Sequence, residues 1–262
     1  MKIAKAIAAS TLLSCLLLVS GCSSVPVTGR SQFIMMSASQ EMQLGLTSFQ
    51  KIKKETPISK DAKTRAMVER VGQRIAAVAE LPGAQWEFVL FDSPQANAFC
   101  LPGGKVGIYT GILPITQTED GLATVMGHEV AHAVARHGAE RVSESMLIST
   151  GGRILSGSLQ NYSPQTQALI LSAYGVGTQV GRQLPHSRSQ ESEADQIGLI
   201  YMARAGYNPE AAVGFWQRFQ DYNRKRGGAS TPWFLRTHPL DQTRIESIKS
   251  WLPKAKLQYR PQ

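Results

Sequence analysis

The sequence of 262 residues predicts an α+β fold that is mostly helical. Apolar residues recur at helical spacing in long segments, whereas only two short segments are rich in β-branched and aromatic residues. We expect helices over residues 39–54, 61–79, 116–137, 189–205, 208–222 and 237–251. We expect strands over residues 86–91 and 105–109. The two strands would form a short sheet beside the helices.

Capping residues support the limits of these segments. Pro82 and Gly83 close the second expected helix, and Thr116 with Glu119 forms a capping box at the start of the third. Gly206 ends the fourth expected helix.

Residues 143–184 differ from the rest of the chain because they are rich in Ser, Gly, Ala and Gln and poor in charge. Ser163 and Pro164 can start a helix, with the proline at its first position. We expect two helical pieces around a mobile connection. This segment could cover a neighbouring cleft.

The overall composition excludes several classes of protein. With 42% hydrophobic residues the chain is neither disordered nor collagen-like, and three cysteines do not make a disulfide scaffold of this size. The formal charge of +9 is compatible with anionic lipids or acidic partners. The sequence contains no helix-turn-helix, zinc-finger or aromatic–basic pattern, so we expect no nucleic-acid partner.

The N-terminus has the pattern of a secretion signal. Lys2 and Lys5 precede an uncharged apolar run over residues 6–19. That run is too short to span a membrane and is followed by small residues and Cys22. Residues 1–21 are therefore expected to be a signal peptide.

Small residues directly before Cys22 resemble a bacterial lipobox. The resemblance implies that Cys22 is lipidated and anchors the chain to a membrane through its acyl chains. Ser23 resembles the sorting residue that favours the outer membrane. The alternative is a plain signal peptide with an incidental cysteine. Residues 22–38 would form a lipidated tether, since they contain Pro, Gly and several Ser.

The strongest chemical signal is His128-Glu129-Val130-Ala131-His132. Residues four apart on a helix share a face, so His128 and His132 can bind one Zn²⁺. Glu129 can hold the metal-activated water and take its proton as general base, which is the chemistry of zinc-dependent peptide hydrolysis. The alternative, a solvated helix face, does not suit two histidines on an otherwise apolar helix.

A catalytic zinc site needs a third protein ligand. Glu191 and Asp195 are one helical turn apart, so Glu191 can bind the metal while Asp195 hydrogen-bonds a ligating histidine. Glu193 points off that face, and His137 is expected to be a surface or capping residue. The alternative is that the carboxylates make ordinary surface contacts.

These motifs resemble the zinc metallopeptidases of the CAAX prenyl protease, HtpX and Oma type, peptidase family M48. Three further segments are similar to that family: residues 97–111 before the zinc helix, residues 187–195, and Thr237-His238-Pro239 followed by Arg244. The motifs occur in the family's order. The chain is most similar to the soluble lipoprotein subgroup related to BepA-like periplasmic proteases.

The resemblance implies a zincin-like (gluzincin) domain with one Zn²⁺ per chain, held by His128, His132 and Glu191. His238 would donate a hydrogen bond to the oxyanion, or reach the open zinc position and hold the enzyme inactive. As a lone histidine before proline it could instead be a helix cap. Arg244 would be a structural partner behind the ligands, as would Asp195.

The Gly-rich turn and the strand after it are expected to form a sheet edge where extended substrate adds as a strand. The residues concerned are Gly103, Gly104, Lys105, Val106, Gly107 and Ile108. The alternative is a purely structural hairpin. His186 is expected to be an exposed loop residue, although it could compete for the metal. Cys100 is expected to be a small packing residue.

Together these features predict a zinc-dependent metalloendopeptidase for unfolded or misassembled cell-envelope proteins. The domain would span residues 39–252, with a basic tail over residues 253–262. The chain would be lipid-anchored in the bacterial envelope, at the outer membrane facing the periplasm. Its partners would be extended polypeptides, the membrane through Cys22, and envelope assembly proteins. The alternative function is an envelope chaperone or assembly factor with a latent zinc site.

Overall fold

The computed structural model describes residues 22–179, 184–225, 232–239 and 242–261. Its strands are β1 (Cys22–Ser24), β2 (Ser31–Phe33), β3 (Glu87–Phe91), β4 (Ala98–Leu101) and β5 (Lys105–Tyr109). Its α-helices are α2 (Ala38–Glu55), α3 (Ala62–Ala76), α4 (Leu113–Thr116), α5 (Glu119–Val134), α6 (His137–Ser158), α7 (Pro164–Thr178), α8 (Leu184–Arg204), α9 (Ala211–Lys225), α10 (Trp233–Thr237) and α11 (Gln242–Lys256). A 3-10 turn, Thr110–Ile112, leads into α4. The prediction of a mostly helical α+β fold is confirmed.

The larger sheet has the strand order β3-β5-β4, with β5 in the middle. β5 runs parallel to β3 and antiparallel to β4, and all of its residues are buried. The prediction that residues 103–108 form a substrate-binding edge is therefore wrong. Lys105, Val106, Gly107 and Ile108 already pair on both sides, and Gly103 and Gly104 form the turn before them. The edge strands are β3 and β4, and of these the sequence did not reveal β4.

The core is built around α5, in which every residue from Gly121 to Val134 is buried. Thr118 caps α5 by accepting a hydrogen bond from the backbone N–H of Gly121. α5 packs against α8, and the contact is close because Gly127 faces Gly198. A Cβ atom on Gly127 would lie 2.8 Å from the carbonyl oxygen of Gly198. This close approach brings one face of α8 onto the histidine-bearing face of α5.

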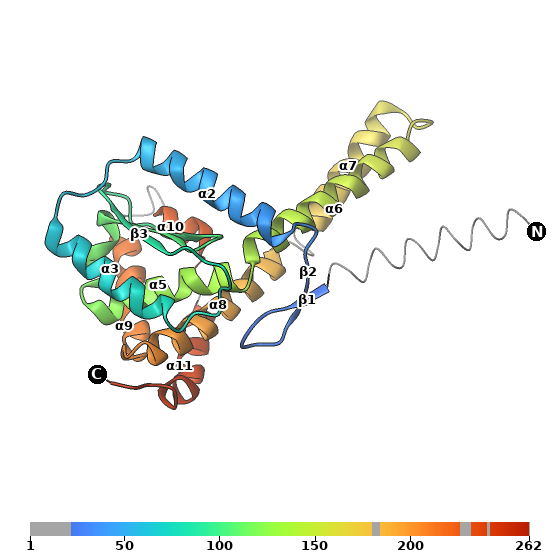
Figure 1. Ribbon diagram of the computed structural model, residues 1–262. Helices are drawn as coiled ribbons and strands as arrows, with labels where there is room; N and C mark the ends of the chain where they lie inside the picture. The colour runs from blue at the N-terminus through green and yellow to red at the C-terminus, as the bar shows by residue number, and fades with distance from the viewer. Residues whose placement is uncertain (1–21, 180–183, 226–231, 240–241, 262) are drawn as a thin grey trace, which may run out of the picture.

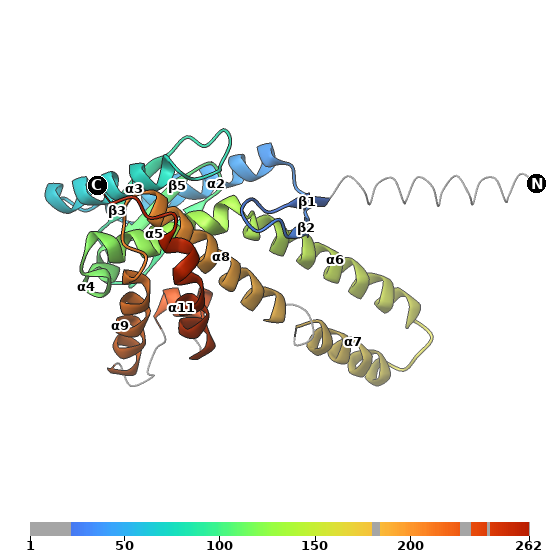
Figure 2. The same ribbon diagram turned by 90° about the horizontal axis from the view of Figure 1, so that it is seen from below.

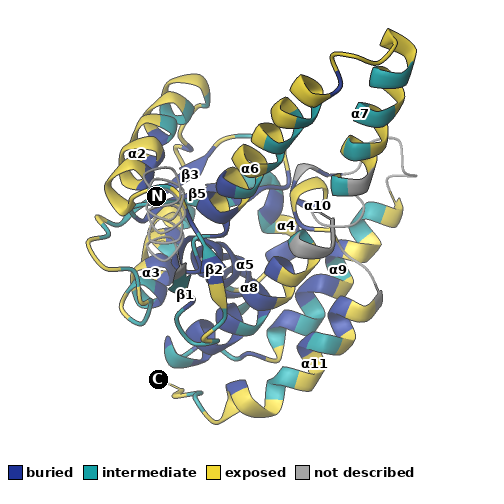
Figure 3. Ribbon diagram, turned by 90° about the vertical axis from the view of Figure 1, so that its right-hand side faces the viewer, coloured by how far each residue is buried: buried dark blue, intermediate teal, exposed yellow. Residues whose placement is uncertain are grey.

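The charge-poor segment forms a helical hairpin, α6 and α7, that projects from the body of the molecule (Figures 1 and 2). Figure 3 shows buried residues gathered in α5 and α8 and exposed residues along α6 and α7. Large apolar side chains such as Ile154 and Leu169 are exposed. The hairpin points away from the body (Figures 1 and 2), so in this structure it does not cover a cleft, as residues 143–184 were expected to be able to do. In the part of the chain described here, no helix is both long and apolar enough to cross a membrane.

Residues 22–38 and 253–262, expected to be a tether and a tail, both contain regular structure and buried residues. The stretch expected to be a tether contains the antiparallel hairpin β1–β2, and Val25 between the strands is buried in the core. At the other end, α11 continues past Pro253, and Ala255 is buried. The predicted signal peptide, residues 1–21, lies outside the described residues.

Candidate metal centre

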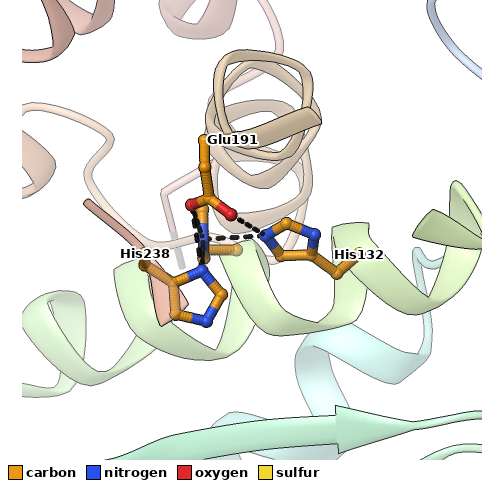
Figure 4. A group of neighbouring side chains, drawn as sticks. His132, Glu191 and His238 are labelled. Atoms are coloured by element: carbon orange, nitrogen blue, oxygen red, sulfur yellow. Dashed lines mark hydrogen bonds and ion pairs between the residues drawn. The ribbon is translucent and has the colours of Figure 1, made fainter. Parts of the chain in front are cut away.

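Four buried side chains bring their donor atoms to one point of the molecule. His128 and His132 come from α5, Glu191 comes from α8, and His238 directly follows α10. One ligand atom of each residue lies within 4.8 Å of the others. Figure 4 shows His132, Glu191 and His238 turned toward one another. Two or three imidazoles with one carboxylate are the ligand types that zinc prefers.

The distances within this cluster suit ligands that share one ion. His128 Nε2 lies 3.1 Å from His132 Nε2, and each ring nitrogen lies 3.3 Å from a Glu191 carboxylate oxygen. Two ligands about 2.1 Å from a tetrahedral ion are roughly 3.4 Å apart. Four buried donors at such spacing have room for one small cation.

The chemistry of the donor set also fits a cation. The buried Glu191 Oε1 accepts no hydrogen bond from the described residues, so it has a lone pair to offer. Burial lowers the pKa of His132 well below its ordinary value, so its ring is neutral near pH 7. Burial also lowers the pKa of His128, but hydrogen bonds to Asp195 and Glu191 outweigh it and raise the value to about 9. A bound cation would displace that proton.

Glu129 lies on the side of the cluster that faces a cleft of the protein surface. Its carboxylate oxygen Oε1 is 3.3 Å from His238 Nε2. The side chain is buried, and burial raises its pKa. A carboxylate with a raised pKa is a better proton acceptor near neutral pH than an exposed one.

The fold places Asp195 and Arg244 behind His128, where the sequence predicted a supporting role. Asp195 Oδ1 lies 2.9 Å from His128 Nδ1. Arg244 donates to both oxygens of Asp195, at 2.7 and 2.9 Å, and its guanidinium stacks on Trp216. This bidentate pair fixes the carboxylate, and through it the orientation of the His128 ring.

Two residues behind His132 were missed in the sequence. His137, expected at the surface, is fully buried, with Nδ1 2.8 Å from His132 Nδ1. Glu193, expected only to point off the face of Glu191 and Asp195, is buried and lies 3.0 Å from His137 Nε2. The reason is that Arg136 has φ of 55°, which ends α5 and turns α6 so that His137 faces back. Helical spacing assumes one continuous helix, so it does not predict the change of direction at Arg136.

The cleft beside the cluster has a volume of about 680 Å³ and is bordered by β4 and α5. Its walls include Glu129, His132, His238 and Cys100. Burial raises the pKa of the Cys100 thiol, so this residue is a neutral packing group. The backbone of His186 lies in α8, and its side chain is outside the described part of the chain.

Comparison with known proteins settles the family. The sequence model described as peptidase family M48 matches residues 62–252, which is most of the chain. The chain belongs to peptidase family M48. Members of this family are zinc metallopeptidases, so this M48 protein is a metalloendopeptidase with zinc as its cofactor, and the predicted zincin-like fold and family are confirmed.

Named relatives agree with this assignment. The mitochondrial metalloendopeptidase OMA1 of Schizosaccharomyces pombe is 36% identical over 89% of this chain and 67% of its own length. OMA1 of Saccharomyces cerevisiae is 34% identical over 91% of this chain and 74% of its own length. The β-barrel assembly-enhancing protease of Escherichia coli is 28% identical over 86% of this chain and 46% of its own length.

The relatives contradict the predicted location of the M48 protein. The relatives with the higher identities are mitochondrial OMA1 proteins, and the bacterial protease is more distant. The expectation of a lipid-anchored protein at the bacterial outer membrane, facing the periplasm, is therefore wrong. It depended on the N-terminal residues and on the resemblance to the lipoprotein subgroup.

Proposed function

We propose that this metalloendopeptidase hydrolyses peptide bonds of unfolded or misassembled polypeptides that bind in extended form. The observation that carries the proposal is the position of Glu129, which lines the cleft beside the four converging donor atoms. The name of the Escherichia coli relative links that protein to assembly, which supports misassembled polypeptides as a substrate class.

His128, His132 and Glu191 would hold one zinc ion. When bound, zinc polarises a scissile carbonyl and lowers the pKa of a water molecule. Glu129 would hold that water in line with the carbonyl carbon and accept its proton at the carboxylate. His238 would donate from Nε2, the ring nitrogen that faces Glu129, to the developing oxyanion.

The sheet edge beside the cleft is β4, and this edge suits an extended substrate. β4 pairs with β5 on one side, and within the described residues no strand pairs with its other side. Residues of β4 line the cleft together with Glu129 and His132. A substrate added to β4 would gain main-chain hydrogen bonds that do not depend on side-chain identity.

The β4 contact can be tested with a series of peptide substrates, each methylated at one backbone nitrogen near the scissile bond. A strand uses alternate N–H groups for pairing, so methylation should raise KM at every second position. Equal effects at all positions would contradict strand addition.

The proposed function is tested by casein cleavage with the zinc-loaded protein, wild type beside Glu129→Gln. Glutamine keeps the shape of the side chain but accepts no proton, so we expect cleavage to fall by about 10²–10⁴-fold with zinc still bound. The matched control is Glu55→Gln on α2, whose side chain is 62% exposed. Equal cleavage by wild type and Glu129→Gln would contradict the role of Glu129.

One observation favours a second function, that of a binding or assembly factor with a latent site. His238 Nδ1 lies 2.9 Å from Glu191 Oε2 and 3.1 Å from His128 Nε2, so His238 stands where a fourth ligand would. A catalytic zinc needs that position open. Substitution His238→Ala separates the two roles: cleavage rises if His238 blocks the site and falls if it stabilises the oxyanion.

A further inference from the structure

A line of buried polar groups runs from His132 to the N-terminal hairpin. His132 Nδ1 lies 2.8 Å from His137 Nδ1, and His137 Nε2 lies 3.0 Å from Glu193 Oε2. Arg30 donates from Nε to the same Glu193 oxygen at 2.7 Å, and the hydroxyl of Thr28 donates to the other oxygen. Arg30 and Thr28 belong to the β1–β2 segment, more than a hundred residues away in the sequence.

The protons along this line are set from its outer end, because the ionised Glu193 carboxylate can only accept a hydrogen bond and a neutral His137 ring carries a single N–H. His132 donates from Nδ1 to His137 Nδ1, and His137 donates from Nε2 to the Glu193 carboxylate. The remaining lone pair of His132 is then on Nε2, the nitrogen that faces the ligand cluster. The line therefore selects the tautomer and the ring orientation that a metal ligand needs.

The outer end of the line is held by the hairpin. Arg30 binds both oxygens of Glu140 on α6 at 2.8 Å each, while its Nε holds Glu193 on α8. The side chain of Glu193 is only 6% exposed, whereas that of Arg30 is 27% exposed. Arg30, the charged group of the hairpin that fixes Glu193, thus reaches the surface.

We propose that the β1–β2 hairpin is a positioning element of the metal site, acting on His132 through Glu193 and His137. Docking of the hairpin and binding of zinc then strengthen each other by the same factor, because linkage is reciprocal. A partner that pulls residues 22–33 away from the body lowers the affinity for zinc. This inference rests on the proposed function only in that His132 is taken as a zinc ligand.

The test is the affinity of the full chain for Zn²⁺, measured by competition with a chromophoric chelator. His137→Phe keeps the volume of the ring but removes both hydrogen bonds, and we expect a 10–100-fold loss of affinity. His137→Gln can accept from His132 through its carbonyl oxygen and donate to Glu193 through its amide, so it should recover part of that loss. Arg30→Met should lower the affinity for Zn²⁺ by about 3–10-fold, because Arg30 contacts Glu193 and acts on His137 only through it.

Two controls separate the possible failures. Arg70→Met removes an exposed pair with Glu119 on α5 and should leave the affinity unchanged. His132→Ala removes the ligand itself. If it leaves the affinity unchanged, the ligand assignment falls and the hairpin proposal with it. If His132→Ala weakens binding but His137→Phe and Arg30→Met stay within twofold of wild type, the hairpin proposal alone is overturned.

A second measurement tests the proposal first on the wild type. Hydrogen–deuterium exchange of peptides covering residues 23–36 in the wild type should slow when zinc is added and speed up when a chelator removes it. In His137→Phe the exchange of the same peptides should no longer respond to zinc. Exchange that is independent of zinc in the wild type overturns the proposal.

Discussion

The two histidines of α5 differ in how the fold holds the ring nitrogen that faces away from the ligand cluster. His128 Nδ1 meets the Asp195 carboxylate directly at 2.9 Å. His132 Nδ1 meets a second imidazole, that of His137, and a carboxylate follows only behind it. Both rings are oriented by a carboxylate, but Asp195 contacts His128 directly, whereas Glu193 acts on His132 through the neutral ring of His137.

The two supports also differ in where they end. Asp195 is held by Arg244, whose side chain is 5% exposed, in a pair enclosed by α8, α11 and Trp216 on α9. The support of His132 ends instead at Arg30, in a hairpin at the edge of the molecule. The first support cannot open unless the core opens, whereas the second opens if the hairpin detaches. The centre therefore has one permanent and one separable side.

The largest effect is expected on the permanent side, for Asp195→Ala. This change breaks a buried ion pair and removes the acceptor of His128, so the free energy of unfolding should fall by about 3–5 kcal/mol. Urea denaturation of the metal-free protein measures the loss. The control is Asp221→Ala, which breaks the exposed pair with Arg224 and should change the free energy of unfolding by less than about 0.5 kcal/mol.

If Asp195→Ala costs no more than its control, the enclosed pair does not hold the core, and the contrast between the two supports fails. Replacing both partners, as Asp195→Leu with Arg244→Met, should recover part of the stability, because no buried charge is left unpaired.

An intermediate effect is expected on the separable side, for Glu193→Gln. The amide keeps the size of the side chain and one acceptor oxygen but loses the charge that Arg30 and Thr28 bind. Hydrogen bonds to charged groups contribute about 1.5–3 kcal/mol, so urea denaturation should show a loss in that range. A loss as large as that of Asp195→Ala would mean that the hairpin side is as integral to the core as the enclosed side.

The same contrast explains what could be predicted from the sequence. His128, His132, Glu191 and Asp195 follow from helical spacing, which is a local rule, and the structure brings all four together. His137 and Glu193 were missed because each depends on a tertiary feature. The left-handed conformation of Arg136 redirects His137, and α6 with the hairpin covers the face of α8 that carries Glu193.

The sheet shows the same limit. The strands β3 and β5 were both predicted, and they pair with each other, but β4, the other partner of β5, was not predicted, because pairing partners are set by contacts distant in sequence. Residues 98–101 carry no alternating pattern, so β4 and the open edge it provides were not expected. The N-terminal segment misled for a similar reason: its Ser, Pro and Gly content is typical of a tether, whereas Val25 and Arg30 dock it on the domain.

The smallest effect is expected for Thr28→Val, at the outermost contact of the separable side. Valine has nearly the shape of threonine but no hydroxyl, so Glu193 loses one hydrogen bond while keeping those from Arg30 and His137. Urea denaturation should show a loss of about 1 kcal/mol. Protection of residues 23–36 from hydrogen exchange should fall more than that of α5, since only the hairpin is loosened. Equal loss of protection in both would show that the hairpin opens only together with the core, and the division into a permanent and a separable side would then have to be given up.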